Sequence, residues 1–257
     1  MRNAIESFVR LGYIAKGVVY LLIGALALRV AAGLHGGRLT DPGGALYVVL
    51  RRPYGHALLL AIAVGLLAYA GWQIVSAILG RHRHGREGVL ARALTIVRAS
   101  VYGLIGVQAM KLAIGLHGSH TGPEPLVRAA LHWPFGAWLV LACGLGSACY
   151  GIIQIRDAIN GHLEPDLDAI TLRQRAGEWA LQLARAGIVA RALVLFLLAV
   201  GVIRAGLIHR ASVAGGMDAS LVILNSMPQG TFLLGATAAG LLAYGVYQFL
   251  HARFATV

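Results

Sequence analysis

Six long stretches of mostly apolar residues alternate with more polar connections along the chain. They cover residues 9–33, 55–79, 93–116, 135–158, 183–207 and 229–252. Each is as long as the roughly 20 apolar residues that an α-helix needs to cross a hydrocarbon core of ~30 Å. The pattern therefore predicts six membrane-spanning helices.

The second, fourth and sixth stretches share one motif, in which Pro-x-Gly is followed at fixed spacing by Ala, Gly, Tyr and Gln. Because the last four positions recur every four residues, they form one ridge on a helix. The three ridges are Ala61, Gly65, Tyr69, Gln73; Ala142, Gly146, Tyr150, Gln154; and Ala236, Gly240, Tyr244, Gln248. Small residues let a neighbouring helix approach closely, and the polar pair can hydrogen-bond to it. We predict a helix-packing ridge; a polar pore lined by the tyrosines and glutamines is the alternative.

The first, third and fifth stretches are also related to one another. Residues 9–36 align without a gap with 91–118 and more loosely with the segment from 184 onward. Each odd stretch and the even stretch after it form a repeat, at about 8–80, 90–158 and 182–253 within one transmembrane domain over 1–257. Because each repeat crosses the membrane twice, all three enter from the same side. The predicted fold is all-α, a pseudo-threefold six-helix bundle of three parallel two-helix repeats.

Shorter apolar pieces at 43–50, 125–131 and 218–224 each end just before one of the motif prolines. We predict that they form short helices on the bilayer surface. Asp41 and Asp218 are suitable N-terminal signals for two of them. We predict that Pro53, Pro134 and Pro228 start the long helices that follow.

The composition is 58% hydrophobic with a mean hydropathy of +0.73, which is more apolar than a soluble domain of this size allows. The net charge is +12, and 14 of the 22 Lys and Arg residues lie on the side that holds both termini. This asymmetry predicts a multi-pass protein of the cell membrane with both termini cytoplasmic. Basic residues beside membrane spans favour anionic lipid headgroups, and not nucleic acid, as partners.

These motifs resemble those of a bacterial membrane family called domain of unknown function 1206 (DUF1206), whose members carry a two-helix transmembrane unit three times. The resemblance covers essentially the whole chain. It rests on the even-helix motif and on the odd-helix opening at 10–20, echoed by Arg185 and Arg191. The second unit departs from it, with Leu94 and Thr95 at the positions of a glycine and a tyrosine. The resemblance implies the fold and the membrane location and no activity.

Each odd helix carries two repeated cations. The first set is Lys16, Arg98 and Arg191; the second set, 13 residues later and about 220° around the helix, is Arg29, Lys111 and Arg204. Both sets cannot face the bundle axis, and the apolar neighbours of the second set predict that it extends outward from a lipid face. For the first set two interpretations remain open: extension to cytoplasmic headgroups, or an inward basic ring that binds an anion or a lipid phosphate. We take the first set as candidate anion-contact or lipid-contact residues.

The sequence contains no Gly-x-Ser-x-Gly, no His-Glu-x-x-His and no phosphate-binding glycine-rich loop with a lysine. His35, His117 and His209 follow the odd helices at similar places, but arginines beside them would repel a metal ion. We therefore expect neither catalysis nor a metal or cofactor.

The resulting hypothesis is a non-catalytic binding or scaffold protein whose basic cytoplasmic face contacts anionic lipids or partner proteins. The alternative is a small transporter or channel for an anionic or lipid-like solute. An acidic proton relay is disfavoured, because none of the ten Asp and Glu residues lies in the middle of an apolar stretch.

Overall fold

The computed structural model describes residues 2–78, 86–116, 122–160, 174 and 176–254. Its six long helices are α1 (Arg2–Ala31), α3 (Gly55–Ile78), α4 (Arg86–Ala113), α6 (Gly136–Ile159), α8 (Glu178–Ile208) and α10 (Gly230–Phe254). Each contains a segment long and apolar enough to cross a membrane. The predicted all-helical, multi-pass architecture is thus confirmed.

A short helix precedes each even helix, as the sequence predicts. These are α2 (Pro42–Leu50), α5 (Glu124–Leu131) and α9 (Met217–Ser226), with a single 3₁₀ turn (Ala211–Val213) before α9. The Oδ1 atom of Asp41 accepts a hydrogen bond from the backbone N–H of Gly44 at 2.7 Å and caps α2. Asp218 lies in the first turn of α9, where the helix dipole favours an acidic side chain.

The Pro-x-Gly motif forms the tight turn between each short helix and the long helix after it. The long helices begin at the glycine, two residues beyond the proline, so the prediction that the prolines start them is corrected. A Cβ on Gly55 would lie 2.5 Å from the carbonyl oxygen of Leu50, and one on Gly230 would lie 2.0 Å from that of Asn225. Glycine is required because the new helix begins directly against the end of the short one.

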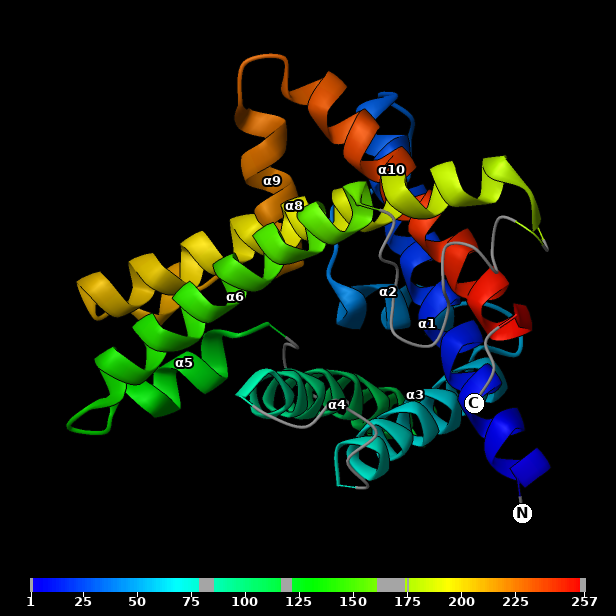
Figure 1. Cartoon of the computed structure of the whole chain (residues 1–257). Coiled ribbons are helices and arrows are strands. Elements are labelled where there is room, and N and C mark those ends of the chain that lie inside the picture. Colours follow the sequence, from blue (N-terminus) through cyan, green and yellow to red (C-terminus); the bar gives the residue numbers. More distant parts are fainter. Residues whose placement is uncertain (1, 79–85, 117–121, 161–173, 175, 255–257) are drawn as a thin grey trace.

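The long helices form three side-by-side pairs: α3 with α4, α6 with α8, and α10 with α1 (Figure 1). Each pair joins the even helix of one repeat to the odd helix of the next, and the α10–α1 pair connects the last repeat to the first. Helices of one repeat also pack together in the first and third repeats, as α1 with α3 and α8 with α10. The beginning of α1 and the end of α10 therefore lie at the same end of the bundle.

The second repeat departs from this arrangement, because the described residues of α4 and α6 do not pack as their counterparts do. In the other two repeats a glycine of the odd helix touches the motif tyrosine. A Cβ on Gly12 would lie 2.5 Å from the Cβ of Tyr69, and one on Gly187 would lie 2.5 Å from the backbone nitrogen of Tyr244. The matching position in the sequence of the second repeat is not a glycine but Leu94. The pseudo-threefold symmetry is broken at this α4–α6 seam.

The glycine of the predicted packing ridge lies directly against a neighbouring helix in two repeats. A Cβ on Gly65 would lie 2.8 Å from the backbone oxygen of Leu11 on α1, and one on Gly240 would lie 2.3 Å from the Cβ of Ala190 on α8. Gly146 is exposed, and a Cβ there would meet nothing within 4 Å among the described residues. The prediction is wrong at Gly146 because α4 does not pack against this part of α6.

The alanine at the start of the ridge is exposed in all three repeats, at Ala61, Ala142 and Ala236. The ridge turns about 40° around the helix with each step of four residues. The glycine and the tyrosine can therefore face a neighbouring helix while the alanine two steps earlier than the tyrosine faces outward. The prediction of packing is wrong at the alanines.

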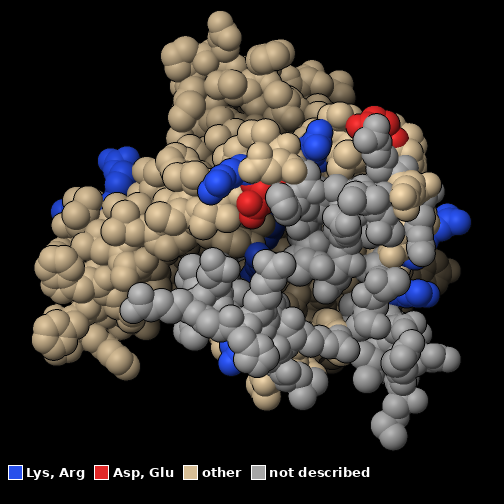
Figure 2. All heavy atoms as spheres, viewed as in Figure 1, with Lys and Arg blue, Asp and Glu red and all other residues tan. Residues whose placement is uncertain are grey.

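Apolar side chains fill the interior between α1, α3, α4 and α10. Ile23, Leu66, Leu112 and Leu241 are each almost completely buried there. Most of the described surface visible in Figure 2 consists of residues other than Lys, Arg, Asp and Glu. Apolar side chains are thus abundant both inside and outside, as expected when the bilayer is the solvent.

The glycines of the ridge give a direct test of this packing. Gly65→Leu and Gly240→Leu should each destabilise the bundle by ~1 to 3 kcal/mol, because overpacking must separate two helices in contact. The melting temperature of the purified protein in detergent should fall for both variants. Gly146→Leu is the matched control and should melt close to the parent. A comparable loss for Gly146→Leu would contradict the open α4–α6 seam.

Candidate functional site

Cations and tyrosines from all six long helices meet inside the bundle. We call this set the basic-aromatic cluster; it consists of Lys16, Arg98 and Arg191 with Tyr13, Tyr20, Tyr69, Tyr102, Tyr150 and Tyr244. It lies toward the beginning of the odd helices and the end of the even helices, which is one end of the bundle. Its cations are the three that the repeat analysis selects as candidate contact residues.

Lys16 is the most enclosed cation of the cluster, with 2% of its surface exposed. Its Nζ atom is 5.1 Å from the ring centroid of Tyr102, 5.4 Å from that of Tyr244, 5.5 Å from that of Tyr69 and 6.0 Å from that of Tyr13. Each contact of this kind contributes roughly 0.5 to 2 kcal/mol, most where water is excluded. Four aromatic rings thus offset part of the cost of removing the ammonium from water.

Arg191 is held by neutral groups from three other helices. Its Nε atom donates to the hydroxyl of Tyr20 and its Nη1 atom donates to Oε1 of Gln154, each at 3.2 Å, and its Cζ lies 5.1 Å from the ring centroid of Tyr244. Tyr244 therefore touches both Lys16 and Arg191. Arginine stays protonated in proteins, so this part of the cluster keeps its positive charge.

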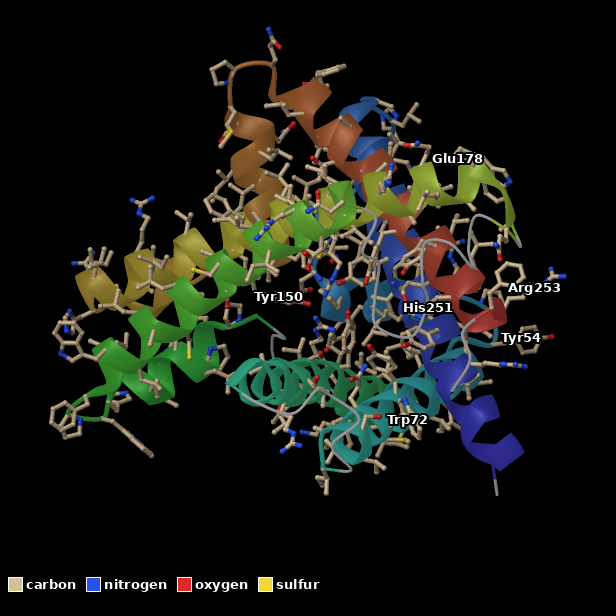
Figure 3. The ribbon with its side chains drawn as sticks, viewed as in Figure 1. Tyr54, Trp72, Tyr150, Glu178, His251 and Arg253 are labelled. Atoms are coloured by element: carbon tan, nitrogen blue, oxygen red, sulfur yellow. The ribbon has the colours of Figure 1, made fainter. Side chains whose placement is uncertain are left out.

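Arg98 connects the two helices at the α4–α6 seam. Its Cζ lies 5.0 Å from the ring centroid of Tyr150, which projects from α6 toward the interior (Figure 3). Arg98 and Arg191 are both partly exposed, unlike Lys16. The two arginines are therefore the cations that a group entering the cluster can reach.

The glutamines of the motif do not play the same part in all three repeats. The Nε2 atoms of Gln73 and Gln154 each donate at 2.8 Å to the hydroxyl of the tyrosine one turn earlier, Tyr69 and Tyr150. Both bonds lie within a single helix. Among the described residues, the motif glutamines form one hydrogen bond between helices, in which Oε1 of Gln154 accepts from Arg191. Gln248 is fully buried, and both its amide atoms lack a hydrogen-bond partner among the described residues.

The second set of cations lies elsewhere. Arg29, Lys111 and Arg204 are exposed, near the other ends of the odd helices. The structure thus brings the first set together inside the bundle and leaves the second set on the outside, as the opposite faces of the two sets suggest.

Two aromatic partners of the cluster are missed by repeat analysis. His251 of α10 is completely buried and stacks on Tyr13 of α1, with 4.1 Å between ring centroids, and Figure 3 shows it on the side of α10 that faces α1. Neither residue recurs at the matching positions, where the chain has Ser76 and Asp157, and Thr95 and Ile188. The other members were visible in the sequence because each recurs in at least two of the three repeats.

The chemistry available in the cluster is that of positive charge, aromatic faces and phenolic hydroxyls. Such groups can bind an anion. In the described part of the chain, no group of three His, Cys, Asp or Glu residues could hold a metal ion. His117, one of the three histidines considered from the sequence, lies outside that part.

Comparison with known proteins agrees with the repeat analysis. The family model Domain of Unknown Function (DUF1206) matches residues 11–80, 94–161 and 186–255. The chain is similar to the uncharacterized protein YxxB of Bacillus subtilis (strain 168), with 32% identity over 248 residues, which cover 96% of this chain and 90% of that protein. No solved structure matches the chain. The chain therefore belongs to the DUF1206 family and contains its characteristic segment three times.

Proposed function

We propose that the protein is a non-catalytic binding protein of the cell membrane and that its basic-aromatic cluster binds the phosphate of an anionic lipid. The observation that carries this proposal is the environment of Arg191. Its guanidinium lies inside the bundle, and the described residues that hold it, Tyr20, Gln154 and Tyr244, are all neutral. A positive charge in such a place is stabilised by an anion that can reach it.

The arrangement of the cations supports the same proposal. Lys16 and Arg191 lie 5.4 Å and 5.1 Å from the centroid of one ring, that of Tyr244, so their charges are near each other in partly desolvated surroundings. Like charges repel more strongly there than in water. A phosphate beside Arg98 and Arg191 reduces this repulsion, and the planar guanidinium group matches phosphate oxygens in pairs.

A transporter for an anionic or lipid-like solute is the second candidate function. The α4–α6 seam favours it, because a lipid-like molecule could enter there beside Arg98 and Tyr150. The filled interior between α1, α3, α4 and α10 favours the binding protein, because transport needs a path past the midplane. The two candidates share the anion-binding cluster and differ in whether the bundle opens.

We propose membrane lipids as the principal partners and do not propose nucleic acid or a catalytic reaction. A protein partner at the basic rim of the bundle is compatible with the scaffold form of the proposal. By the rim we mean the side of the bundle that holds both termini. The excess of Lys and Arg on this side supports a cytoplasmic position for it.

The orientation predicts the outcome of reporter fusions. A fusion after Arg86 should report a cytoplasmic location, and fusions near Gly43, Gly122 and Gly215 should report an external one. Activity of a periplasmic or extracellular reporter such as alkaline phosphatase measures this directly. The reverse pattern would place the basic-aromatic cluster toward the outer side of the membrane.

Binding at the cluster predicts a lipid-dependent stability. Phosphatidylglycerol should raise the melting temperature of the purified protein more than phosphatidylcholine with the same acyl chains, because a ligand of the folded state stabilises it. The double variant Arg98→Gln with Arg191→Gln should lose the part of this difference that comes from the cluster and respond clearly less than the parent. Lys16 is left unchanged because its burial makes misfolding of a variant hard to separate from lost binding.

The matched control is Lys111→Gln with Arg204→Gln, which removes the same charge from exposed positions of the same repeats. This control should keep most of the response to phosphatidylglycerol. Equal losses from the two double variants would mean that the response is a general attraction between arginine or lysine and an anionic surface, and the proposed role of the cluster would be wrong.

A further inference from the structure

A groove of about 250 Å³ lies on the outside of the bundle, near the end of α1 opposite the basic-aromatic cluster. Its long wall is the face of α1 that includes Val18, Leu22 and Arg29. The end of α2 and the beginning of α3 form the other side, through Val49 and Leu58. Three elements of the first repeat thus enclose one groove on the surface that faces lipid.

The lining of the groove is apolar except at one end. The two charged residues are Arg29, in the last turn of α1, and Arg52, which follows the end of α2. Both are exposed. The Nη2 atom of Arg29 donates to the backbone oxygen of His35 at 2.5 Å, which fixes the guanidinium and leaves its other N–H groups available.

The dimensions of the groove match one leaflet of a membrane. From Val18 to Arg29 the helix rises by about 16 Å, at 1.5 Å per residue. Half of a hydrocarbon core of ~30 Å is ~15 Å. When the two arginines lie at the level of the headgroups, the apolar wall therefore reaches the middle of the bilayer.

We propose that this groove binds one anionic phospholipid, with an acyl chain along α1 and the phosphate between Arg29 and Arg52. The charge of the two arginines selects an anionic headgroup, and the apolar wall selects a lipid over a free anion. The site is separate from the cluster, because Lys16 and Arg29 are about 20 Å apart along α1. It therefore extends the proposed function and does not depend on it.

The site belongs to the first repeat alone. Arg29 has counterparts in Lys111 and Arg204, but the positions that match Arg52 hold Trp133 and Met227. The other two repeats thus keep a counterpart of Arg29 and have no cation at the position of Arg52. This difference provides a control pair within the same chain.

Lipid titration of the full-length protein, monitored by native mass spectrometry, tests the proposal. The protein is first depleted of lipid in detergent and then titrated with phosphatidylglycerol or with phosphatidylcholine of the same acyl chains. The double variant Arg29→Gln with Arg52→Gln should bind one phosphatidylglycerol about thirtyfold more weakly, or about fivefold for each arginine. Its binding of phosphatidylcholine should match that of the parent.

Two further variants separate the groove from a general charge effect. Lys111→Gln with Arg204→Gln should bind phosphatidylglycerol as the parent does. Ala25→Trp, which places a large side chain in the groove and changes no charge, should also weaken binding of one phosphatidylglycerol. Equal weakening by the two charge variants, or full binding by Ala25→Trp, would overturn the proposal. The variants at Arg98 and Arg191 report on the cluster independently.

Discussion

An ammonium group that lies inside a membrane bundle must be surrounded by groups that replace water, and the rest of this structure depends on how that is done at Lys16. Four tyrosine rings within 6.0 Å of its Nζ atom provide the replacement. These rings come from α1, α3, α4 and α10, so the position of one charge fixes the relative positions of four helices. Arg191 of α8 is likewise surrounded by groups that replace water, because it contacts Gln154 of α6 and the ring of Tyr244 of α10. The cluster is therefore a structural element as well as the proposed binding site.

The three repeats differ in how closely their odd and even helices pack. Gly12 and Gly187 let the odd helix lie directly against the motif tyrosine of its own repeat. The second repeat has a leucine at this position in the sequence, and the described residues of its two helices do not pack together in the same way. Arg98 connects them through the ring of Tyr150, a contact that works at a longer distance than glycine packing.

The number, approximate length and order of the long helices could be predicted from the sequence, because the length of each apolar stretch and the repeated motifs can be read from it directly. The helical angle between the two sets of cations showed that they lie on different faces, but it left open whether the first set extends to the headgroups or points inward. The neighbours of each helix could not be predicted. Leu94 was recognisable in the sequence as a departure from the pattern. The close contact between Gly12 and Tyr69, which shows what the glycine position does, became visible only in the structure. His251 could not be found, because repetition detects only what occurs in more than one copy.

The pairing of α10 with α1 has a consequence for how the protein is made. Of the six long helices, α1 is synthesised before the others and its main neighbour α10 after them, so this pair cannot form until all six have been made. Before α10 is made, Tyr244 is absent, so Lys16 lacks one of the four tyrosine rings that surround its ammonium group. Contacts between the ends of a chain form late and slowly in folding. Lys16, the most buried of the described cations, therefore acquires its full set of aromatic contacts only after α10 has been inserted. A chain truncated before α10 lacks the contact between Lys16 and Tyr244.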